Sequence, residues 1–80
     1  MLEEIKDCYS RIYKGNKKDW RERTSKKIGI SEQSLRVGIN GMTLGEEHRA
    51  AVLKYAKKEL IRQRKMEDAA LNIEVTFEEL

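Results

Sequence analysis

The stretch RERTSKKIGISEQSLRVGIN, residues 21–40, decides the fold that we expect of this chain. A basic helical segment reaches Gly29, a residue that adopts the positive φ of a sharp turn at low steric cost. Ser31 follows and can cap the amides of a second helix. In that helix Leu35 and Ile39 stand four residues apart, so both face inward. The stretch therefore predicts two helices joined by a tight turn, with the rest of the chain as their scaffold.

Two helices are expected before the turn. Residues 2–13 carry apolar side chains at the three- and four-residue spacings of an amphipathic helix. These are Leu2, Ile5, Tyr9, Ile12 and Tyr13. Gly15 and Asn16, in the stretch KGNKK, tolerate the left-handed conformation that ends helices, so we expect a short loop there. Asp19 then caps the second helix, with Glu22 as its capping partner three residues later.

Trp20 is the largest apolar side chain in the chain and stands just inside the start of this second helix. Thr24 and Ile28 lie on the same side of that helix, which favours a place in the core. Stacking on a nucleic-acid base is the alternative role for Trp20. Cys8 has a similar pair of interpretations, because it is either a small buried apolar residue or a redox-sensitive thiol.

Gly38 is unusual within the third helix, because glycine in a helix costs about 1 kcal/mol relative to alanine. Either a neighbouring helix approaches closely at this point, or the third helix is short and frays. The pair Asn40-Gly41 is a turn signal, and we expect the third helix to end there.

A long fourth helix is expected next, with Thr43 as its cap and Glu46 as the capping partner. It runs to about Ala70 without glycine or proline. Its expected apolar stripe is Ala50, Leu53, Ala56 and Leu60, widened by Val52, Tyr55 and Ile61. His48, in its first turn, is expected to be exposed or to cap the helix. After Ile61 the sequence is polar all round, so the far end should project from the body or dock on a partner.

The last ten residues, LNIEVTFEEL, alternate between apolar and polar residues, which is typical of a half-buried β-strand. A strand needs a partner, and its twin in a homodimer could supply one. A disordered acidic tail and a continuation of the fourth helix are the alternatives. We therefore expect an all-α bundle of four helices with a long C-terminal helix and a short C-terminal strand. Residues 1–66 form the globular domain, and residues 67–80 form an acidic tail that contributes to dimerisation.

Charge is distributed unevenly along the chain. Residues 1–65 contain all 17 Lys and Arg residues and nine acids, whereas residues 66–80 contain five acids and no base. Within the basic part, residues 11–36 hold nine basic and three acidic residues. Such density provides affinity for nucleic acid through the release of counterions, although basic surfaces also serve solubility alone.

Several classes of protein are not expected. Cys8 cannot form a disulfide within the chain, and with His48 as the only histidine no set of metal ligands is present. No catalytic constellation occurs at useful spacing, so we expect no enzyme, no cofactor and no small-molecule substrate. The N-terminus has no apolar run of a signal peptide, and no apolar stretch is long enough to span a membrane. We expect a soluble, cytoplasmic protein.

Residues 24–41 resemble the helix-turn-helix of the lambda-repressor-like family of transcriptional regulators. The likeness rests on small and apolar residues around the turn, namely Ser25, Ile28, Gly29, Ile30, Ser31, Leu35 and the closing pair Asn40-Gly41. It covers about a quarter of the chain. This sequence has Ser25 where that family usually has alanine, Gly38 where it usually has a large apolar residue, and no glutamine at the start of the first motif helix.

The resemblance implies that the helix from Ser31 to Asn40 enters the DNA major groove. Its base-reading positions, carried over residue by residue, are Gln33, Ser34, Arg36, Val37 and Asn40. The chemistry agrees, because Arg can bond guanine, Gln can bond adenine and Val can contact a thymine methyl group. Phosphates would be held by Lys17, Lys18, Arg21, Lys26 and the helix start at Ser31. For each of these lysines a solvated surface role is the alternative.

We therefore expect a repressor-like, sequence-specific DNA-binding regulator of a phage or bacterium. As a homodimer it would read a palindrome with two recognition helices one DNA turn, ~34 Å, apart. The alternative is a helical protein-interaction module that uses the long fourth helix and the C-terminal tail. Binding of single-stranded RNA is disfavoured, because the chain has one Trp, one Phe and no aromatic and basic sheet motif.

Overall fold

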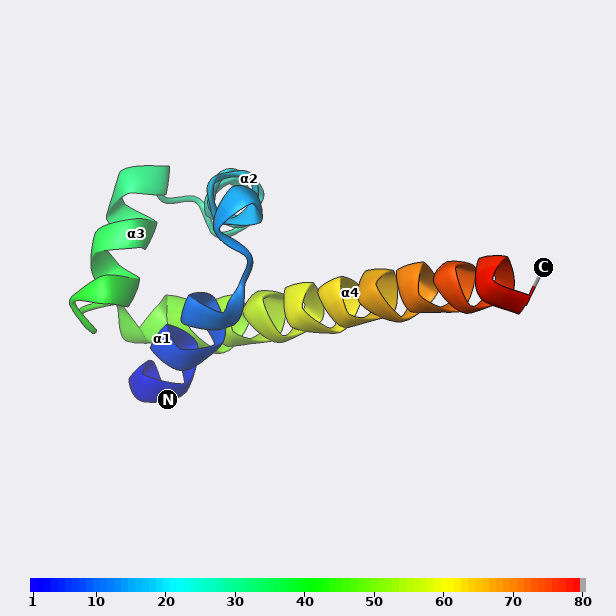
Figure 1. Cartoon of the computed structure of the whole chain (residues 1–80). Helices are drawn as coiled ribbons and strands as arrows, with labels where there is room; N and C mark the ends of the chain where they lie inside the picture. The colour runs from blue at the N-terminus through cyan, green and yellow to red at the C-terminus, as the bar shows by residue number, and fades with distance from the viewer. Residues whose placement is uncertain (80) are drawn as a thin grey trace.

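The computed structural model describes the backbone of residues 1–79 and the side-chain surroundings of residues 1–67. Four helices follow one another, α1 (Leu2–Arg11), α2 (Lys14–Ile28), α3 (Glu32–Asn40) and α4 (Glu46–Glu79). The helix α1 packs against the first half of α4, and α2 and α3 complete a small body around it (Figure 1). The second half of α4 extends away from this body, so the molecule measures 52 × 21 × 17 Å. The expected all-α, four-helix architecture is confirmed.

The core lies where α1, α2 and α3 meet the first half of α4. Its buried members are Ile5, Tyr9, Ile12, Trp20, Leu35, Ile39, Leu44, Val52 and Ala56. Trp20 is only 1% exposed, its ring centroid lies 5.6 Å from that of Tyr9, and its indole N–H donates to the backbone carbonyl of Tyr55 at 3.2 Å. The core interpretation of Trp20 is confirmed, and this side chain ties α2 to α4.

The break between α1 and α2 lies earlier than the sequence suggested. The helix α1 ends at Arg11 and α2 begins at Lys14, so the stretch KGNKK is helical and not a loop. Asp19 consequently lies inside α2 and does not cap it; its carboxylate instead accepts from Arg23 at 2.9 Å, one turn later. The prediction of a loop at residues 14–18 and of a cap at Asp19 was wrong.

A side chain of α4 explains this position of the break. Ile12 and Tyr13 have extended backbone, with ψ of 135° at both residues. The amide of Tyr13 donates to Oε1 of Gln63 at 2.9 Å, and Nε2 of Gln63 donates to the carbonyl of Arg11 at 3.2 Å. Gln63 thus satisfies a backbone donor and a backbone acceptor that the interrupted helix leaves open. Because these bonds join residues about 50 positions apart, no local pattern could predict them.

The buried face of α4 also differs from the expected stripe. The helix begins at Glu46, so Gly45 and not Thr43 holds the cap position. Ala56 is buried as expected, but Ala50 is exposed and Ile61 is 57% exposed. Glu59, an acid, is buried instead, and it accepts from Arg23 at 3.2 Å. The expected stripe was therefore partly wrong.

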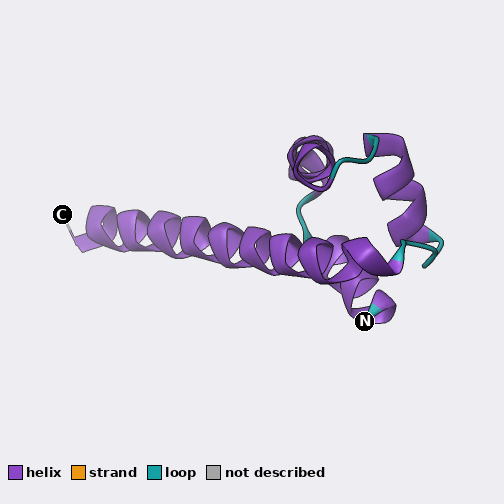
Figure 2. Cartoon of the chain, turned by 180° about the vertical axis from the view of Figure 1, so that it is seen from behind, coloured by secondary structure: helices purple, strands orange, loops and turns teal. Residues whose placement is uncertain are grey.

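The C-terminal strand expected from the alternating pattern is not supported. Over residues 1–79 the structure contains helices and loops but no strand, and α4 continues to Glu79 (Figure 2). This agrees with the alternative of a continued fourth helix, while the final residue lies outside the described part of the chain. The expected boundary between residues 66 and 67 falls inside α4. In the described residues, no helix has the length and apolar character needed to cross a membrane.

Candidate nucleic-acid interface

The turn between α2 and α3 is built as the sequence predicted. Gly29 has φ of 78°, and its amide and that of Ile30 both donate to the carbonyl of Ser25, at 2.9 and 3.1 Å. Ser25 is 5% exposed, and its hydroxyl donates to the carbonyl of Glu22 at 3.0 Å. A small residue at position 25 therefore lets the two helices approach closely, and its polar atom remains satisfied by the backbone.

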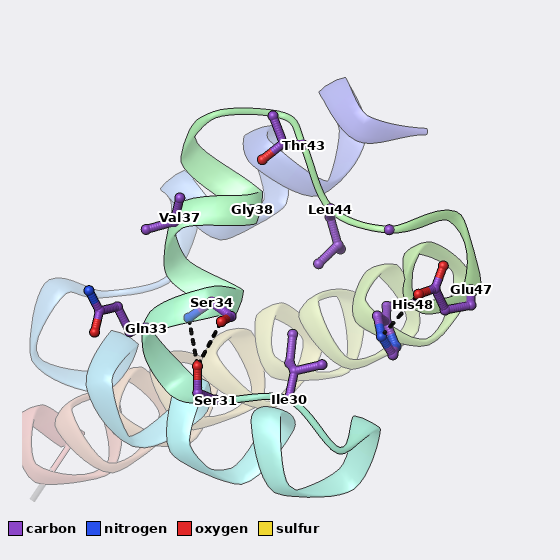
Figure 3. Close-up of a pocket in the computed structure, with 11 residues that line it drawn as sticks. Ile30, Ser31, Gln33, Ser34, Val37, Gly38, Thr43, Leu44, Glu47 and His48 are labelled. Carbon is purple, nitrogen blue, oxygen red and sulfur yellow. Dashed lines mark hydrogen bonds and ion pairs between the residues drawn. The ribbon is translucent and has the colours of Figure 1, made fainter.

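Ser31 caps α3, as predicted. Its Oγ accepts from the amide of Ser34 at 3.0 Å and donates to the Oγ of Ser34 at 2.7 Å (Figure 3). The Ser31 side chain is thus engaged by the helix itself. If this end of α3 meets a phosphate, the backbone amides and not the Ser31 hydroxyl are the donors that remain for it.

The two sides of α3 have different surroundings. Leu35 and Ile39 are buried, at 0% and 1% exposed, and they fix the helix on the core. All five predicted base-reading residues, Gln33, Ser34, Arg36, Val37 and Asn40, are exposed. Gln33 and Val37 extend from the same side of α3, opposite to the side that faces Leu44 (Figure 3). The structure therefore brings the predicted base-reading residues together on one short helix.

A steric contact explains why glycine occupies position 38, a question that the sequence left open. A Cβ at this position would lie 3.2 Å from Cδ1 and 3.3 Å from Cα of Leu44. The close neighbour is the segment between α3 and α4 and not another helix. The carbonyl of Gly38 also accepts from the amides of Thr43 and Leu44, at 2.9 and 3.2 Å. Glycine thus allows this segment to seal the end of α3, and the helix does not fray.

The Arg21 side chain is bound by other residues of the protein, whereas a phosphate contact requires a side chain that is available in solvent. Its Nε donates to Oε1 of Glu32 at 2.6 Å, and its NH1 donates to the hydroxyl of Tyr9 at 2.7 Å. Its side chain is 15% exposed. These bonds connect α1, α2 and the first turn of α3, so Arg21 holds α3 in position.

The region around the Arg21–Glu32 ion pair, at the start of α3, carries a positive charge. The pKa of the Glu32 carboxyl is held below its ordinary value, chiefly by the hydrogen bond from Arg21 and further by the positive charges of Arg36 and Lys18. The same hydrogen bond is the largest cause of the raised pKa of Arg21. Because Arg21 neutralises Glu32, the acid does not cancel the positive charge that Arg36 and Lys18 bring to this end of α3.

The remaining predicted phosphate contacts differ among themselves. Lys18 and Lys26 are exposed on α2. Lys17 is half-buried, and its Nζ lies 5.1 Å from the centroid of the Tyr9 ring, the geometry of a cation–π contact. Lys18 and Lys26 are therefore better placed than Lys17 and Arg21 to meet a ligand in solvent.

A groove beside α3 brings in residues that the sequence did not nominate. It has a volume of about 450 Å³ and is lined on one side by Gln33, Ser34 and Val37. Its other side comes from the segment after α3 and the first turn of α4, with Thr43, Glu47 and His48 (Figure 3). Nε2 of His48 lies 3.6 Å from the carboxylate of Glu47. Because these residues have no motif spacing relative to α3, only the fold reveals that they are neighbours.

Comparison with protein families, with curated proteins and with solved structures finds no match to this chain. The geometry of α2, the turn and α3 therefore carries the functional argument.

Proposed function

We propose that the protein is a sequence-specific regulator of transcription that binds double-stranded DNA, as a homodimer, by placing α3 in the major groove. The observation that carries this proposal is the division of α3 into a buried side, with Leu35 and Ile39, and an exposed polar side. A short helix fixed in this manner after a tight turn is the arrangement that helix-turn-helix proteins use to present side chains to base edges.

The charges around α3 support the same proposal. Lys18, Lys26 and Arg36 are exposed on α2 and α3, and the carboxylate of Glu32 is paired with Arg21. Positive side chains on either side of a recognition helix bind phosphates and fix its register on the duplex. Arg21 contributes indirectly, because it orients the first turn of α3.

Three exposed side chains offer direct base recognition. Arg36 presents a planar guanidinium that can donate two hydrogen bonds to O6 and N7 of a guanine. Gln33 can pair in the same bidentate manner with N6 and N7 of an adenine, and Val37 can contact a thymine methyl group. Each good bidentate contact discriminates against the wrong base by ~1–3 kcal/mol. Ser34 and Asn40 flank these positions.

The test begins with selection of preferred sites from random duplex DNA, followed by gel-shift titration of the selected and of a scrambled duplex at two salt concentrations. Substitution Arg36→Lys keeps the charge but removes the fork geometry. We expect it to lower affinity for the selected site by about tenfold, in line with one lost bidentate contact, and to leave the scrambled duplex within about twofold. Lys26→Ala should weaken binding to both duplexes and reduce the salt dependence.

Lys6→Ala is the matched control, because it removes a positive charge from an exposed position on α1, outside α2 and α3. It should leave the preference between the two duplexes unchanged. Equal losses on both duplexes for Arg36→Lys would remove Arg36 from base reading. Absence of any binding at low salt would refute DNA binding altogether.

A helical protein-interaction module is the second candidate function. The observation that favours it is the extension of α4 beyond the body, with Ile61 57% and Met66 61% exposed. Large apolar side chains on a projecting helix are typical of a surface that another protein covers. This candidate predicts no selected DNA sequence at all, so the selection experiment separates the two functions.

A further inference from the structure

An apolar groove lies on α4 away from α3. Ala50, Leu53 and Ile61 line it together with Met1 from the start of the chain, and its volume is about 440 Å³. Ile61 and Met1 are 57% and 60% exposed. Three lysines of α4 border it, Lys54, Lys57 and Lys58. We call these seven residues the α4 groove.

The α4 groove combines an apolar floor with a positive rim. Lys54, Lys57 and Lys58 are all exposed, and the contact of Lys57 with Glu4, at 3.9 Å between two exposed side chains, is worth little. A phosphate backbone would gain nothing from the apolar floor. A negatively charged amphipathic helix would use both features, because its apolar side covers the floor and its acids meet the lysines.

The chain itself contains a helix of that composition. Residues 67–79 carry five acids and no base. By sequence, Leu71 and Val75 stand 14 and 18 residues after Lys57, close to whole numbers of helical turns, so these two apolar positions share the side of the helix that bears the groove. Because α4 is one continuous helix from Glu46 to Glu79, this acidic half cannot fold back onto the groove of its own molecule. It can reach an α4 groove only on a second molecule.

We propose that two copies of this chain pair through α4 in antiparallel orientation, with residues 67–79 of each copy seated in the α4 groove of the other. The arrangement is two-fold symmetric, so both contacts form at once. It sets residues 50–79 of the two helices side by side over about 45 Å, at 1.5 Å per residue. It specifies the interface of the homodimer proposed above and does not depend on DNA binding.

The charges favour antiparallel over parallel pairing. In an antiparallel pair the lysines at positions 54–58 lie opposite the acids around positions 74–79 of the partner copy. In a parallel pair the same lysines would face each other, and so would the acids, which is destabilising. The separation of charge along α4 therefore specifies orientation as well as association.

The test measures the mass of the full-length protein by light scattering after size exclusion, without DNA. One variant reverses the charge at the rim of the α4 groove, by combining Lys54→Glu, Lys57→Glu and Lys58→Glu. A second variant reverses the charge of the acidic tail, by combining Glu74→Lys, Glu78→Lys and Glu79→Lys. We expect the unaltered chain to be dimeric at about 100 μM, and each reversal to weaken the dimer by about tenfold or more. Combining all six substitutions should restore the dimer, because opposite charges again meet.

Each result decides the proposal. A monomeric unaltered chain, a dimer that is insensitive to both reversals, or a six-site variant that stays monomeric with unchanged helical circular dichroism would overturn it. Loss of DNA binding by the groove variant with an unchanged mass would overturn it too, since the lysines would then bind nucleic acid. Because the masses are measured without DNA, failure of DNA binding leaves this result interpretable.

Disulfide crosslinking gives a second readout that is independent of the charges. Two variants are made in a Cys8→Ser background, one with Lys54→Cys and one with Val75→Cys. In an equal mixture, antiparallel pairing predicts a crosslink between the two different variants. A parallel pair predicts crosslinks of each variant with itself, and that outcome would overturn the proposed orientation.

Discussion

Gly38 shows how a single missing side chain shapes the recognition surface. It sits in α3, where alanine is intrinsically preferred, yet Leu44 lies within 3.3 Å of the place that a Cβ would occupy. The nearest atoms include the backbone Cα of Leu44. The amide of Leu44 donates a hydrogen bond to the carbonyl of Gly38, which holds this backbone in place. Steric repulsion therefore opposes helix propensity at this position.

We predict that Gly38→Ala lowers the free energy of unfolding by about 1 kcal/mol, because overpacking costs about 1–3 kcal/mol and exceeds the gain of about 1 kcal/mol in propensity. Gly15→Ala is the matched control, since its Cβ would meet nothing within 4 Å in α2. That substitution should raise stability by about 0.5–1 kcal/mol. Urea denaturation measures both, and stabilisation by Gly38→Ala would show that Leu44 yields easily.

Local chemistry made the residues of the turn predictable from sequence. Gly29 and Ser31 act through neighbours within a few residues, and Leu35 and Ile39 follow helical spacing, so their roles could be predicted. Arg21 could not be assigned in this way. Its partners Tyr9 and Glu32 lie in two other helices, and its place between them follows only from the packing of α1 against α3.

The tie between Arg21 and Glu32 links α3 to the rest of the body at the scale of elements. The hydrogen bond from Arg21 keeps the folded-state pKa of Glu32 below its ordinary value of 4.5. A carboxyl with a lowered pKa stabilises the fold fully above its unfolded-state pKa, and that contribution is lost as the pH falls through the folded-state value.

We predict that Glu32→Gln reduces stability at neutral pH and that the difference from the unaltered protein shrinks as the pH falls below 4.5. Urea midpoints recorded between neutral pH and pH 3 would show this convergence. In an Arg21→Gln background the effect of Glu32→Gln should lose most of its pH dependence, because the residue that chiefly lowers the pKa of Glu32 is absent. A pH-independent effect of Glu32→Gln in the unaltered background would contradict the tie.

The sequence-based prediction misplaced the ends of helices where those ends depend on distant contacts. The start of α2 is determined by Gln63, which lies on α4. The last ten residues alternate in polarity, yet they follow an uninterrupted run of helix formers, and the helix continues through them to Glu79. Short alternating patterns do not reveal what precedes or covers a segment, so tertiary context overrides them.

At the scale of the whole molecule, the length of α4 determines how two copies of α3 can be spaced. In the proposed antiparallel pair the two starts of α4 lie about 55 Å apart, at 1.5 Å per residue. The helix α3 is part of the body that surrounds that end of α4 (Figure 1). Two recognition helices therefore lie farther apart than the single DNA turn that the sequence alone suggested.

We predict that DNA sites selected by the full-length protein contain inverted half-sites about two helical turns apart, ~20–21 base pairs between centres, because this is the next spacing that returns to the same side of the duplex. Sequencing of the selected pool measures this distance directly. Half-sites one turn apart would indicate that both bodies lie at the same end of a parallel pair. The matched control is the six-site charge variant, which should keep the two-turn spacing.

The burial of Trp20 has an optical consequence. It is the only tryptophan, it is 1% exposed, and its indole N–H is bound by a carbonyl of α4. Under excitation that is selective for tryptophan, the emission of the protein therefore arises from one chromophore, which senses whether α2 remains docked on α4. The folding kinetics of the body can be followed at this site without any attached label, while the exposed side of α3 is left untouched.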